Sequence, residues 1–550
     1  MINIIKKINY WYVLLGFAVT FGIILRLYGL NRSGIFFYDE ALYLNHSLPI
    51  LELIEKVHPA GQAFWQAMAA YIKAPLAFTK PVWILLVDSR FLFTQVHDWD
   101  YAKYVSCVFG ILTLPIAFIF SRRYFNSLPV ACFSTALLAL LPGHIFYSRI
   151  GLQEAFSIFV VLTGFYYYLF PRDFGKKTFL AGLFLCLGYL ANYRLIVLPM
   201  LVIVTEMWFG LVCKEGIRWR HMIFTCLTFA GIMIFVGSLM DASNGRFVLA
   251  WVMHQGDMAP AKRMWSEVFA YPYYLFRMEN WVLAGAFFAS VYFIFKRELR
   301  LAWPLVICLA QMLLFTTATD RGARYIAVVL PFMTMGVAVL FYRLYQDFSM
   351  AWQKNVVVIL AVVMFAGMVV KAVPLARASS DYRSSSAYLL TKDPSVKFLS
   401  SQENVQKLYF MDRTRVRPVA DNVMSLAKQY SQGYRYLVLD PQAYISFSSS
   451  EYKWGLPLKD YLGYVDKNVK PIRCSLTLTE PLWRGSSLST AIICSNPFNF
   501  WIPLILSGCH HYASMILIHC CQCCQLLSRG RKQRFPEIFH EVLCSSVISG

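Results

Sequence analysis

The feature that most constrains this 550-residue sequence is a series of long apolar stretches separated by short polar segments. A helix needs about 20 consecutive, mostly apolar residues to cross the hydrocarbon core of a bilayer. Eleven stretches approach or reach that length, and the short ones are typical of helices that break inside a protein-lined cavity. These stretches are residues 11–29, 101–120, 128–147, 152–170, 178–191, 195–212, 222–240, 281–295, 301–318, 325–342 and 356–373. The sequence therefore predicts a mostly α-helical, polytopic membrane protein.

The composition excludes other classes of protein. Hydrophobic residues make up 58% of the chain and charged residues 15%, whereas soluble domains contain roughly 45–50% apolar and ~25% charged residues. The 14 cysteines are scattered singly until the last stretch, which is not the pattern of a disulfide framework or a zinc ribbon. A net charge of +21 would suggest nucleic acid in a soluble protein. Here the basic residues lie between the apolar stretches, so we expect contacts with membrane lipid and no nucleic-acid partner.

These basic residues also predict the orientation of the chain. They precede the first stretch and follow the second, fourth, sixth, eighth and tenth. They are Lys6, Lys7, Arg122, Arg123, Arg172, Lys176, Lys177, Lys214, Arg218, Arg220, Lys296, Arg297, Arg300, Arg343 and Lys354. If eleven spans alternate, all of them lie on one side, which the positive-inside rule assigns to the cytoplasm. The N-terminus is then cytoplasmic, and the long segment 30–100 lies outside.

The polar segments predict three regions. Residues 1–373 form the transmembrane domain, and we expect amphipathic helices in its first outer loop. Residues 374–495 form a small α/β domain on the outer face, because short β-like runs alternate there with helix-like segments. The β-like runs are residues 396–399, 408–411 and 436–440, and the helix-like segment is 422–430.

The third region, residues 496–550, has an unusual composition. Six of the 14 cysteines lie there, and the Cys-Cys-x-Cys-Cys run from Cys520 to Cys524 fits either metal ligation or palmitoylation without specifying one. Residues 499–518 form a weak candidate for a twelfth span, which polar residues interrupt. We expect an atypical, Cys-rich tail.

Ionisable residues at membrane depth are functional candidates by default, and the sharpest candidates here are Asp39 and Glu40. The two carboxylates lie between aromatic residues just after the first span. Burial beside aromatic side chains raises the pKa of a carboxylate and makes it a better base. The alternative is structural: Asp39 caps the N-terminus of a helix and Glu40 lies in its first turn.

Three other residues on the predicted outer face are candidates of the same kind. Glu154 begins an otherwise apolar span, where a lipid-facing carboxylate would cost roughly 2–3 kcal/mol, so it should face a cavity or a partner. Arg194 and Arg324 lie at breaks between spans, and an arginine there can hold a phosphate in bidentate fashion. The structural alternatives are snorkelling or an ion pair, for example of Arg321 or Arg324 with Asp320.

Arg149 and His58 complete the set of candidates. Arg149 lies in the tight loop between the third and fourth spans, where it can also snorkel to the interface. His58 lies in the first outer loop, where a lone histidine is usually just solvated. The sequence contains neither a nucleotide-phosphate loop nor a hydrolase nucleophile elbow. A substrate with a lipid tail, a phosphate and a reacting sugar fits acidic and basic groups on one face, although physics alone does not choose it.

Several of these segments, in order along the chain, resemble the polytopic glycosyltransferases of the GT-C class, in the superfamily of protein O-mannosyltransferases and lipid A aminoarabinose transferases. Residues 38–43 resemble the family's Asp-Glu-x-x-Tyr motif, and His58 with Pro59 resembles its His-Pro-Pro element, with Ala60 in place of the second proline. Residues 146–155, 188–194 and 324–331 resemble, respectively, its second outer loop with an acidic residue, a Gly-Leu-Ala-x-x-x-Lys stretch and a later Arg-Tyr-x-x-x-x-Pro element.

The resemblance implies an inverting transfer of a sugar from a polyprenyl-phosphate donor to an acceptor hydroxyl on the outer face of the membrane. It implies that Asp39 is the base, and that Glu40 and Glu154 are further catalytic residues that position the acceptor or tune Asp39. The residues it implies for the donor phosphate are Arg149, Arg194 and Arg324, and those for acceptor positioning are Tyr43 and His58. A divalent cation, which some GT-C relatives use, is an open alternative to a metal-free site.

Two other functions stay open at this point. A transporter or flippase of lipid-linked glycans would carry charged residues near the bilayer midplane and show repeats, and a non-catalytic membrane subunit would present its outer domain to a partner. The sequence does not name the sugar, and the acceptor can be a glycan, a lipid or a protein. We expect a bacterial inner-membrane protein with a cytoplasmic N-terminus and a periplasmic active site.

Overall fold

The computed structural model describes most of the chain up to residue 439 and two short strands beyond it. The described residues are 10–57, 69, 71–72, 80–170, 174–244, 270–316, 323–380, 382–392, 394–410, 413–419, 423–439, 473–476 and 514–519. Contacts within the chain divide it into two units, which we call the membrane unit (Met1–Leu30 and His46–Arg377) and the second unit (Asn31–Asn45 and Ala378–Gly550). This division differs from the predicted one because it places Asn31–Asn45, the segment that contains Asp39, in the second unit.

Among the described residues, seven helices are long and apolar enough to cross a membrane, and four shorter apolar helices accompany them. The long ones lie at Tyr10–Arg32, Tyr101–Phe125, Phe174–Ala191, Tyr193–Val212, Trp219–Met240, Arg324–Asp347 and Ala351–Thr391, and the shorter ones at Leu128–Leu140, Glu154–Leu169, Trp281–Phe295 and Trp303–Thr316. Each of these eleven segments overlaps one predicted stretch, so the predicted polytopic architecture is confirmed. The protein is a multi-pass membrane protein.

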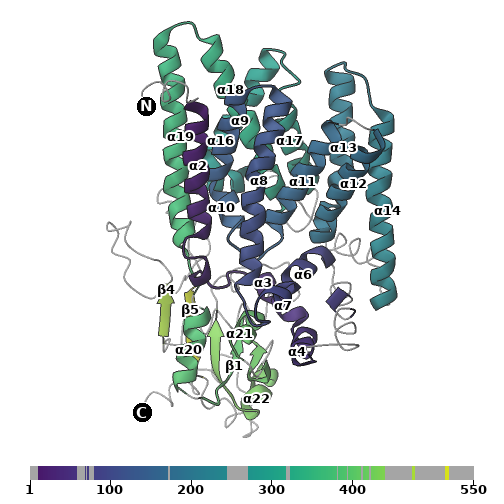
Figure 1. The fold of residues 1–550 in the computed structure, drawn as a ribbon. Coiled ribbons are helices and arrows are strands. Elements are labelled where there is room, and N and C mark those ends of the chain that lie inside the picture. Colours follow the sequence, from purple (N-terminus) through teal and green to yellow (C-terminus); the bar gives the residue numbers. More distant parts are fainter. Residues whose placement is uncertain are drawn as a thin grey trace, which may run out of the picture. The chain divides into compact units, whose positions relative to one another are not determined.

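Figure 1 shows the helices of the membrane unit. In chain order they are α2 (Tyr10–Leu27), α4 (Leu48–Val57), α6 (Pro81–Asp88), α7 (Arg90–Phe93), α8 (Tyr101–Phe125), α9 (Leu128–Leu140), α10 (Pro142–Tyr147), α11 (Glu154–Leu169), α12 (Phe174–Ala191), α13 (Leu198–Met207), α14 (Trp219–Asn244), α16 (Ala270–Phe295), α17 (Trp303–Thr316), α18 (Leu330–Asp347) and α19 (Ala351–Arg377). Short 3-10 turns, η1 (Leu30–Arg32), η2 (Tyr193–Val197) and η5 (Ala323–Val329), and a π-helical turn, η3 (Trp208–Val212), connect or extend some of them.

Proline residues explain why some predicted spans are broken. The predicted span 128–147 is two helices, α9 and α10, because Leu141 adopts an extended conformation (φ −65°, ψ 119°) before Pro142. Similarly, η2 passes into α13 beside a proline near the start of that helix, and η5 passes into α18 in the same way. At the break before η2, the polar side chain of Asn192 is 3% exposed and therefore lies inside the protein.

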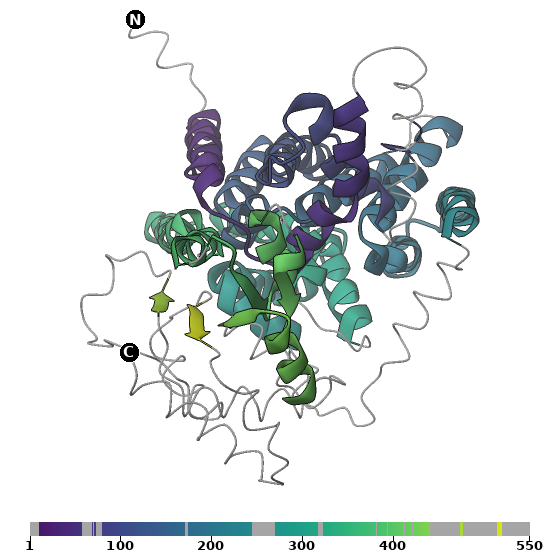
Figure 2. The same ribbon diagram turned by 90° about the horizontal axis from the view of Figure 1, so that it is seen from below.

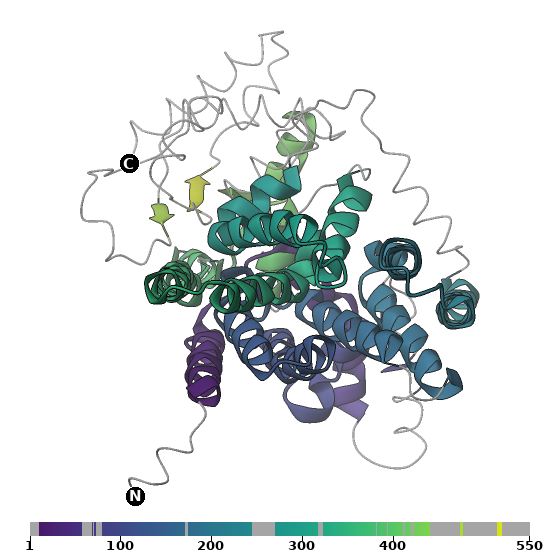
Figure 3. The ribbon, with the colours of Figure 1, turned by 90° about the horizontal axis from the view of Figure 1, so that it is seen from above.

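Seen nearly end-on, the helices of the membrane unit run side by side as a bundle (Figures 2 and 3). α14 lies at one edge of this bundle, and α2 and α19 lie at the opposite edge (Figures 1 and 3). Several apolar side chains of α14 are exposed, including Leu227 at 63%, Ile234 at 62% and Phe235 at 65%. An edge helix with an exposed apolar surface of this kind is expected where the bundle meets lipid tails.

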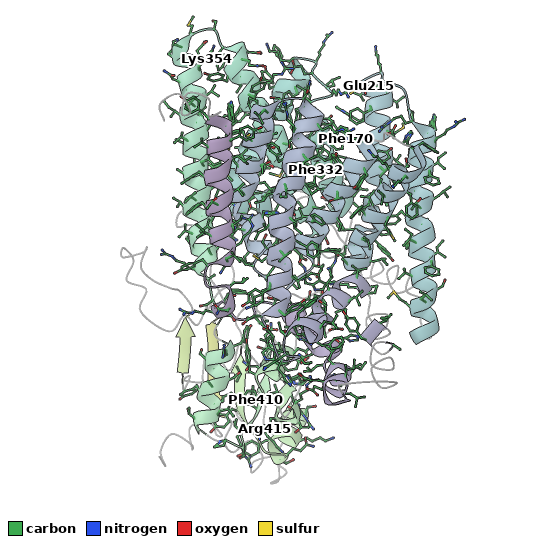
Figure 4. All side chains as sticks on the ribbon, in the orientation of Figure 1. Phe170, Glu215, Phe332, Lys354, Phe410 and Arg415 are labelled. Atoms are coloured by element: carbon green, nitrogen blue, oxygen red, sulfur yellow. The ribbon has the colours of Figure 1, made fainter. Side chains whose placement is uncertain are left out.

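The interior of the bundle contains an aromatic cluster around Trp303, which is fully buried. Its ring stacks on Phe120 at a centroid distance of 6.1 Å and meets Phe332 edge-on at 5.7 Å. The indole N–H of Trp303 donates to the hydroxyl of Thr205 at 3.2 Å, so its one polar atom is satisfied. Figure 4 labels Phe332 within the bundle.

Ion pairs gather at one end of the bundle, where Figure 4 shows both Glu215 and Lys354. The pairs are Arg218 with Glu206, Arg300 with Glu215, Lys296 with Asp347 and Arg343 with Glu298. All four basic partners belong to the set of residues predicted to share one side of the membrane. Their common location fits the predicted alternation of the spans, while the assignment of this side to the cytoplasm stays a prediction.

Part of the first outer loop packs as its own small layer in the membrane unit. Leu48 and Leu51 of α4 lie in one apolar cluster with Tyr71 and Val96. α6 follows with Asp88 at its end, fully buried, and Arg90 of α7 is fully buried as well. The loop thus contains the short helices that its amphipathic pattern predicts.

Among its described residues, the second unit contains a five-stranded sheet with the order β2-β1-β3-β5-β4. The strands are β1 (Lys397–Ser400), β2 (Val416–Pro418), β3 (Tyr434–Leu439), β4 (Arg473–Leu476) and β5 (Ser514–His519), and the helices are α3 (Tyr38–His46), α20 (Tyr382–Lys392), α21 (Glu403–Tyr409) and α22 (Val423–Ser431). β1 pairs in parallel with β2 and β3, whereas β5 pairs antiparallel with β3 and β4. The predicted α/β character of this part of the chain is confirmed.

Two local predictions for this unit are wrong. The run 408–411, predicted as a strand, begins inside α21, which extends to Tyr409, because buried residues at helical spacing decide the conformation there. The weak twelfth span over 499–518 is also not found: Ser514–His519 forms strand β5 in the sheet, and the rest of that segment lies outside the described residues. A short apolar run is compatible with either a strand or part of a helix, and sheet pairing decides between them.

Candidate functional site

Asp39 lies in the first turn of α3, in the second unit. The helix begins at Tyr38, so Asp39 is inside it and partly buried rather than at an N-cap. Glu40, which is 1% exposed, accepts hydrogen bonds through Oε1 from the backbone N–H groups of Phe36 at 3.0 Å and Phe37 at 2.9 Å. Of the two carboxylates Asp39 and Glu40, it is therefore Glu40 that has the structural role at the start of the helix. Its hydrogen bonds fix the turn before α3.

The residues around Asp39 are anchored by the rest of the second unit. The hydroxyl of Tyr38 donates to Oε1 of Glu403 at 3.3 Å. Burial and the nearby negative charge of Glu403 raise the pKa of Tyr38 well above its usual range. Tyr43, predicted to position the acceptor, is 1% exposed and lies in the middle of α3.

In the membrane unit, three cationic side chains meet around two tyrosines. The guanidinium of Arg194 lies over the ring of Tyr325 at 3.8 Å and beside that of Tyr193 at 5.1 Å. Arg324 lies 5.6 Å from the Tyr325 ring, and Lys80 lies 5.7 Å from the Tyr193 ring. We call Lys80, Arg194 and Arg324 the cation cluster. Cations that share aromatic platforms in this way have fixed orientations, and together they can hold an anionic group such as a phosphate.

Tyr147 connects a buried carboxylate, Glu154, with Arg324 of the cation cluster, because the charges of both act on its hydroxyl. Glu154 is 1% exposed and accepts a long hydrogen bond, 3.4 Å, from Nε2 of Gln153. Tyr147 is 4% exposed and lies close enough to Glu154, Arg324 and Glu279 for the charge of each to act on its hydroxyl. Glu154 thus faces the protein interior, as the cost of exposing it to lipid predicts.

Glu279 is a further buried carboxylate, which the sequence analysis did not single out. It is 3% exposed and lies at a break in α16, where its backbone leaves the helical region (φ −128°, ψ 37°). Oε1 accepts a hydrogen bond from the backbone N–H of Gly143, whereas Oε2 has no hydrogen-bond partner in the part of the chain that the structure describes. Glu279 lines a cavity with room for about one water molecule, together with Gly143, Tyr147, Tyr274, Leu275, Met278, Ile326, Ala327 and Leu330.

Arg149 has a different environment from the other predicted phosphate ligands. It is 3% exposed. Its Nη1 donates to the carbonyls of Leu25, Arg26 and Tyr28 at 2.8, 3.0 and 2.8 Å, and its Nη2 donates to the carbonyl of Ala376 at 2.6 Å. Arg149 therefore caps the C-terminal end of α2 and ties it to α19, so we leave it out of the proposed donor site.

Arg26 completes this structural network. It is fully buried and donates through Nη1 to the carbonyls of Gly22 at 2.7 Å and Ala139 at 2.8 Å. Its Nη2 lies 2.6 Å from Nδ1 of His144, and its Nε donates to Ser148 at 3.4 Å. The five donors of a guanidinium suit such a junction, where α2, α9 and α10 meet.

The sequence analysis left open a divalent cation in the site, and the described residues show no ligand set for one. Within the described ranges, no group of three or more His, Cys, Asp or Glu side chains is arranged to hold a metal ion. His58, predicted to position the acceptor, lies outside the described residues.

Comparison with known proteins extends this description. No family model matches the sequence, and no curated protein sequence matches it either. The structure, however, is similar to ArnT from Cupriavidus metallidurans bound to undecaprenyl phosphate, with 15% identity and a TM-score of 0.56 over 80% of this chain and 95% of that one. The chain has the GT-C fold.

Two further structures share this fold. The apo oligosaccharyltransferase of Archaeoglobus fulgidus matches with 11% identity and a TM-score of 0.55 over 84% of this chain and 73% of that one. AglB of the same organism, in complex with an inhibitory peptide and a dolichol-phosphate, matches with 10% identity and a TM-score of 0.52 over 83% and 72%. The fold expected from the sequence motifs is thereby confirmed.

The sequence analysis missed two residues of this arrangement. Glu279 could have been found by the rule that singled out Glu154, because it is an acidic residue at the edge of an apolar span, among aromatic residues. Lys80 carries no comparable signal, since a lysine before a proline in a polar loop is ordinary. The position of Lys80 beside the ring of Tyr193 depends on the tertiary fold and not on the local sequence.

Proposed function

We propose that this protein transfers a sugar from a polyprenyl-phosphate-linked donor to an acceptor hydroxyl, with inversion at the anomeric carbon. The observation that carries the proposal is the cation cluster. Lys80, Arg194 and Arg324 come from distant parts of the sequence and share two tyrosine rings. In a chain whose fold is that of ArnT, a protein seen bound to undecaprenyl phosphate, a phosphate is the ligand that best suits three such cations.

The reaction needs a proton acceptor and an anion-binding group. The acceptor oxygen forms a bond to the anomeric carbon as the bond from that carbon to the phosphate oxygen breaks, and the electron pair of that bond leaves with the phosphate. The acceptor proton goes to the carboxylate of Asp39. General-base help of this kind contributes about 10²–10⁴-fold. The cation cluster stabilises the negative charge that develops on the departing polyprenyl phosphate.

Other residues support these two functions. Glu40 holds the turn that presents Asp39, through its hydrogen bonds to Phe36 and Phe37. Tyr147, whose hydroxyl feels the charges of both Glu154 and Arg324, and Glu154 itself position the substrate. Tyr43 and His58 are assigned to the acceptor side. The acceptor itself is a glycan, a lipid or a protein hydroxyl.

The cellular setting is part of the proposal. We place the protein in a bacterial inner membrane with its N-terminus in the cytoplasm, because the basic residues then lie on the cytoplasmic side. The first outer loop and the second unit are periplasmic in this arrangement, where a lipid-linked sugar that has already crossed the membrane is available.

The test uses the purified full-length protein in detergent with a panel of polyprenyl-phosphate sugars and candidate acceptors. Mass spectrometry follows free polyprenyl phosphate and glycosylated acceptor. We expect turnover by the wild type and by Glu55→Gln, a matched loss of an exposed carboxylate on α4, and loss of turnover in Asp39→Asn. Turnover by Asp39→Asn at the wild-type rate would refute Asp39 as the base. Transport of an unmodified donor across vesicles without its cleavage would favour the flippase alternative.

A further inference from the structure

The helix that carries Asp39 is built into the second unit by contacts that reach across most of the sequence. The residues joined by these contacts are 359 and 365 positions apart. The first outer loop is thereby divided, because Asn31–Asn45 belongs to the second unit and the remainder from His46 onward belongs to the membrane unit. A long polar loop need not divide in this way, so specific contacts must fix α3.

The segment before α3 is fixed by the chain that leads into α20. The backbone N–H of Ser380 donates to the carbonyl of Ser33 at 2.8 Å. Gly34 follows with a φ of +68°, and a Cβ there would collide with the hydroxyl of Ser380. Only glycine accepts both this backbone conformation and this close approach without strain. The entry into α3 is therefore set by Ser380.

α3 itself is fixed at both ends by α21. At its N-terminal end, the hydroxyl of Tyr38, adjacent to Asp39, donates to Glu403 at 3.3 Å. At its C-terminal end, Nδ2 of Asn45 donates to the backbone carbonyl of Asn404 at 2.8 Å. Two hydrogen bonds to neighbouring residues of one helix define both the position of α3 along α21 and its orientation.

α21 is in turn a rigid support. Val405 and Gln406 are fully buried and Leu408 is 3% exposed. The side-chain carbonyl of Gln406 accepts a hydrogen bond from Ser386 of α20. A helix held on its own buried face can act as a fixed platform for what docks on its other side.

From these contacts we infer that α21 positions the candidate base, and that Tyr38, Asn45 and Glu403 are positioning residues for the transfer reaction. The inference rests on the proposed role of Asp39 and gives the second unit a role in catalysis. A misplacement of about 1 Å can cost on the order of 100-fold in rate. Loss of these contacts should therefore lower kcat while donor binding, which we assign to the membrane unit, stays unchanged.

The test compares three variants in the full-length protein. Asn45→Asp keeps the shape of the side chain but removes the donor and places a carboxylate oxygen against the carbonyl of Asn404. Tyr38→Phe removes only the hydroxyl that meets Glu403. Glu403→Gln keeps an oxygen that accepts from Tyr38. Lys428→Ala, at an exposed residue of α22 in the same unit, is the matched control.

The readouts are kcat and donor KM per folded molecule, with the thermal unfolding midpoint measured on the same samples. We expect kcat to fall at least tenfold in Asn45→Asp, by a smaller factor in Tyr38→Phe, and by less than twofold in Glu403→Gln and the control, with donor KM within twofold of the wild type throughout. Wild-type kcat per folded molecule in both Asn45→Asp and Tyr38→Phe would overturn the inference. If Asn45→Asp does not fold, Tyr38→Phe alone decides. An active Asp39→Asn would overturn the proposed function instead, so the two failures are distinguishable.

Discussion

The two units contribute different chemistry in different ways. The membrane unit gathers its cations from breaks between apolar helices, and Arg194 and Arg324 are held over tyrosine rings in these breaks. The second unit holds the candidate base on a helix that comes from far earlier in the chain and is fixed by hydrogen bonds to α21. The difference suggests a division of labour in which one unit binds the leaving phosphate and the other presents the proton acceptor.

Among the variants that test this division of labour, we expect the largest effect from substitutions in the cation cluster. Charge-assisted hydrogen bonds are worth about 1.5–3 kcal/mol each, so the double variant Arg194→Ala/Arg324→Ala should weaken binding of polyprenyl phosphate by roughly 10²–10⁴-fold. Titration of the lipid into protein in detergent measures this loss. Arg220→Ala, at an exposed arginine of α14, should bind like the wild type. Unchanged affinity in the double variant would remove the phosphate role from the membrane unit.

A second experiment tests whether the later part of the first outer loop is stabilised within the membrane unit. Asp88 is fully buried, and burial raises its pKa to about 6, although a hydrogen bond from Ser47 and the charge of Arg90 oppose the shift. A carboxyl with a raised pKa favours folding while it is protonated. Its contribution is therefore full below about pH 4 and is lost as the pH rises through 6, a change of about 3 kcal/mol.

This prediction is checked with thermal unfolding at pH 4 and pH 7. Asp88→Asn cannot titrate, so its stability relative to the wild type should rise by up to about 3 kcal/mol between the two pH values. Glu55→Gln, at an exposed carboxylate of the same loop, should show no such change. A wild type and Asp88→Asn with parallel pH profiles would show that Asp88 does not titrate as its burial predicts.

A smaller effect is expected at the break in α16. Glu279→Ala leaves the backbone N–H of Gly143 without its acceptor, which costs about 1–3 kcal/mol for a buried donor. Glu279→Gln retains an oxygen in that position and should lose less stability. We expect a lower unfolding midpoint for Glu279→Ala than for Glu279→Gln when both are measured in the same detergent. Equal midpoints would mean that the hydrogen bond to Gly143 contributes nothing to stability.

The smallest effect is expected in the second unit. Gly34→Ala places a Cβ in a left-handed conformation, which costs roughly 1–2 kcal/mol, and also displaces Ser380. The change should increase proteolysis of the second unit while the membrane unit keeps its affinity for polyprenyl phosphate. Gly175→Ala, where a Cβ would meet nothing within 4 Å, is the matched control. Equal proteolysis of the two variants would argue against Ser380 as the anchor of this segment.

The sequence predicted the membrane unit well because its signal is local. Each apolar stretch specifies its own helix, and the alternation of basic residues such as Arg218 and Lys296 specifies which ends belong together. The burial of Glu154 was predicted in the same way, from the cost of exposing a carboxylate in an apolar span to lipid. The motif that contains Asp39 was found from its resemblance to a family.

What the sequence did not predict depends on contacts between distant residues. The location of Asn31–Asn45 in the second unit follows from Ser33, Tyr38 and Asn45 meeting residues far along the chain, and no local pattern encodes that. The sequence also did not predict that the guanidinium of Arg149 donates to backbone carbonyls of α2 and α19. The strand β5 was mistaken for part of a span because a short apolar run fits both.

The most direct test of the account is one paired measurement on Asp39→Asn and Arg324→Ala: donor affinity by titration and single-turnover sugar transfer in the same preparation. The account predicts that Asp39→Asn binds the donor like the wild type and loses at least about 100-fold in transfer rate. It predicts that Arg324→Ala loses donor affinity. A variant pair in which Asp39→Asn transfers sugar normally, or in which Arg324→Ala binds the donor normally, would contradict the division of labour between the two units.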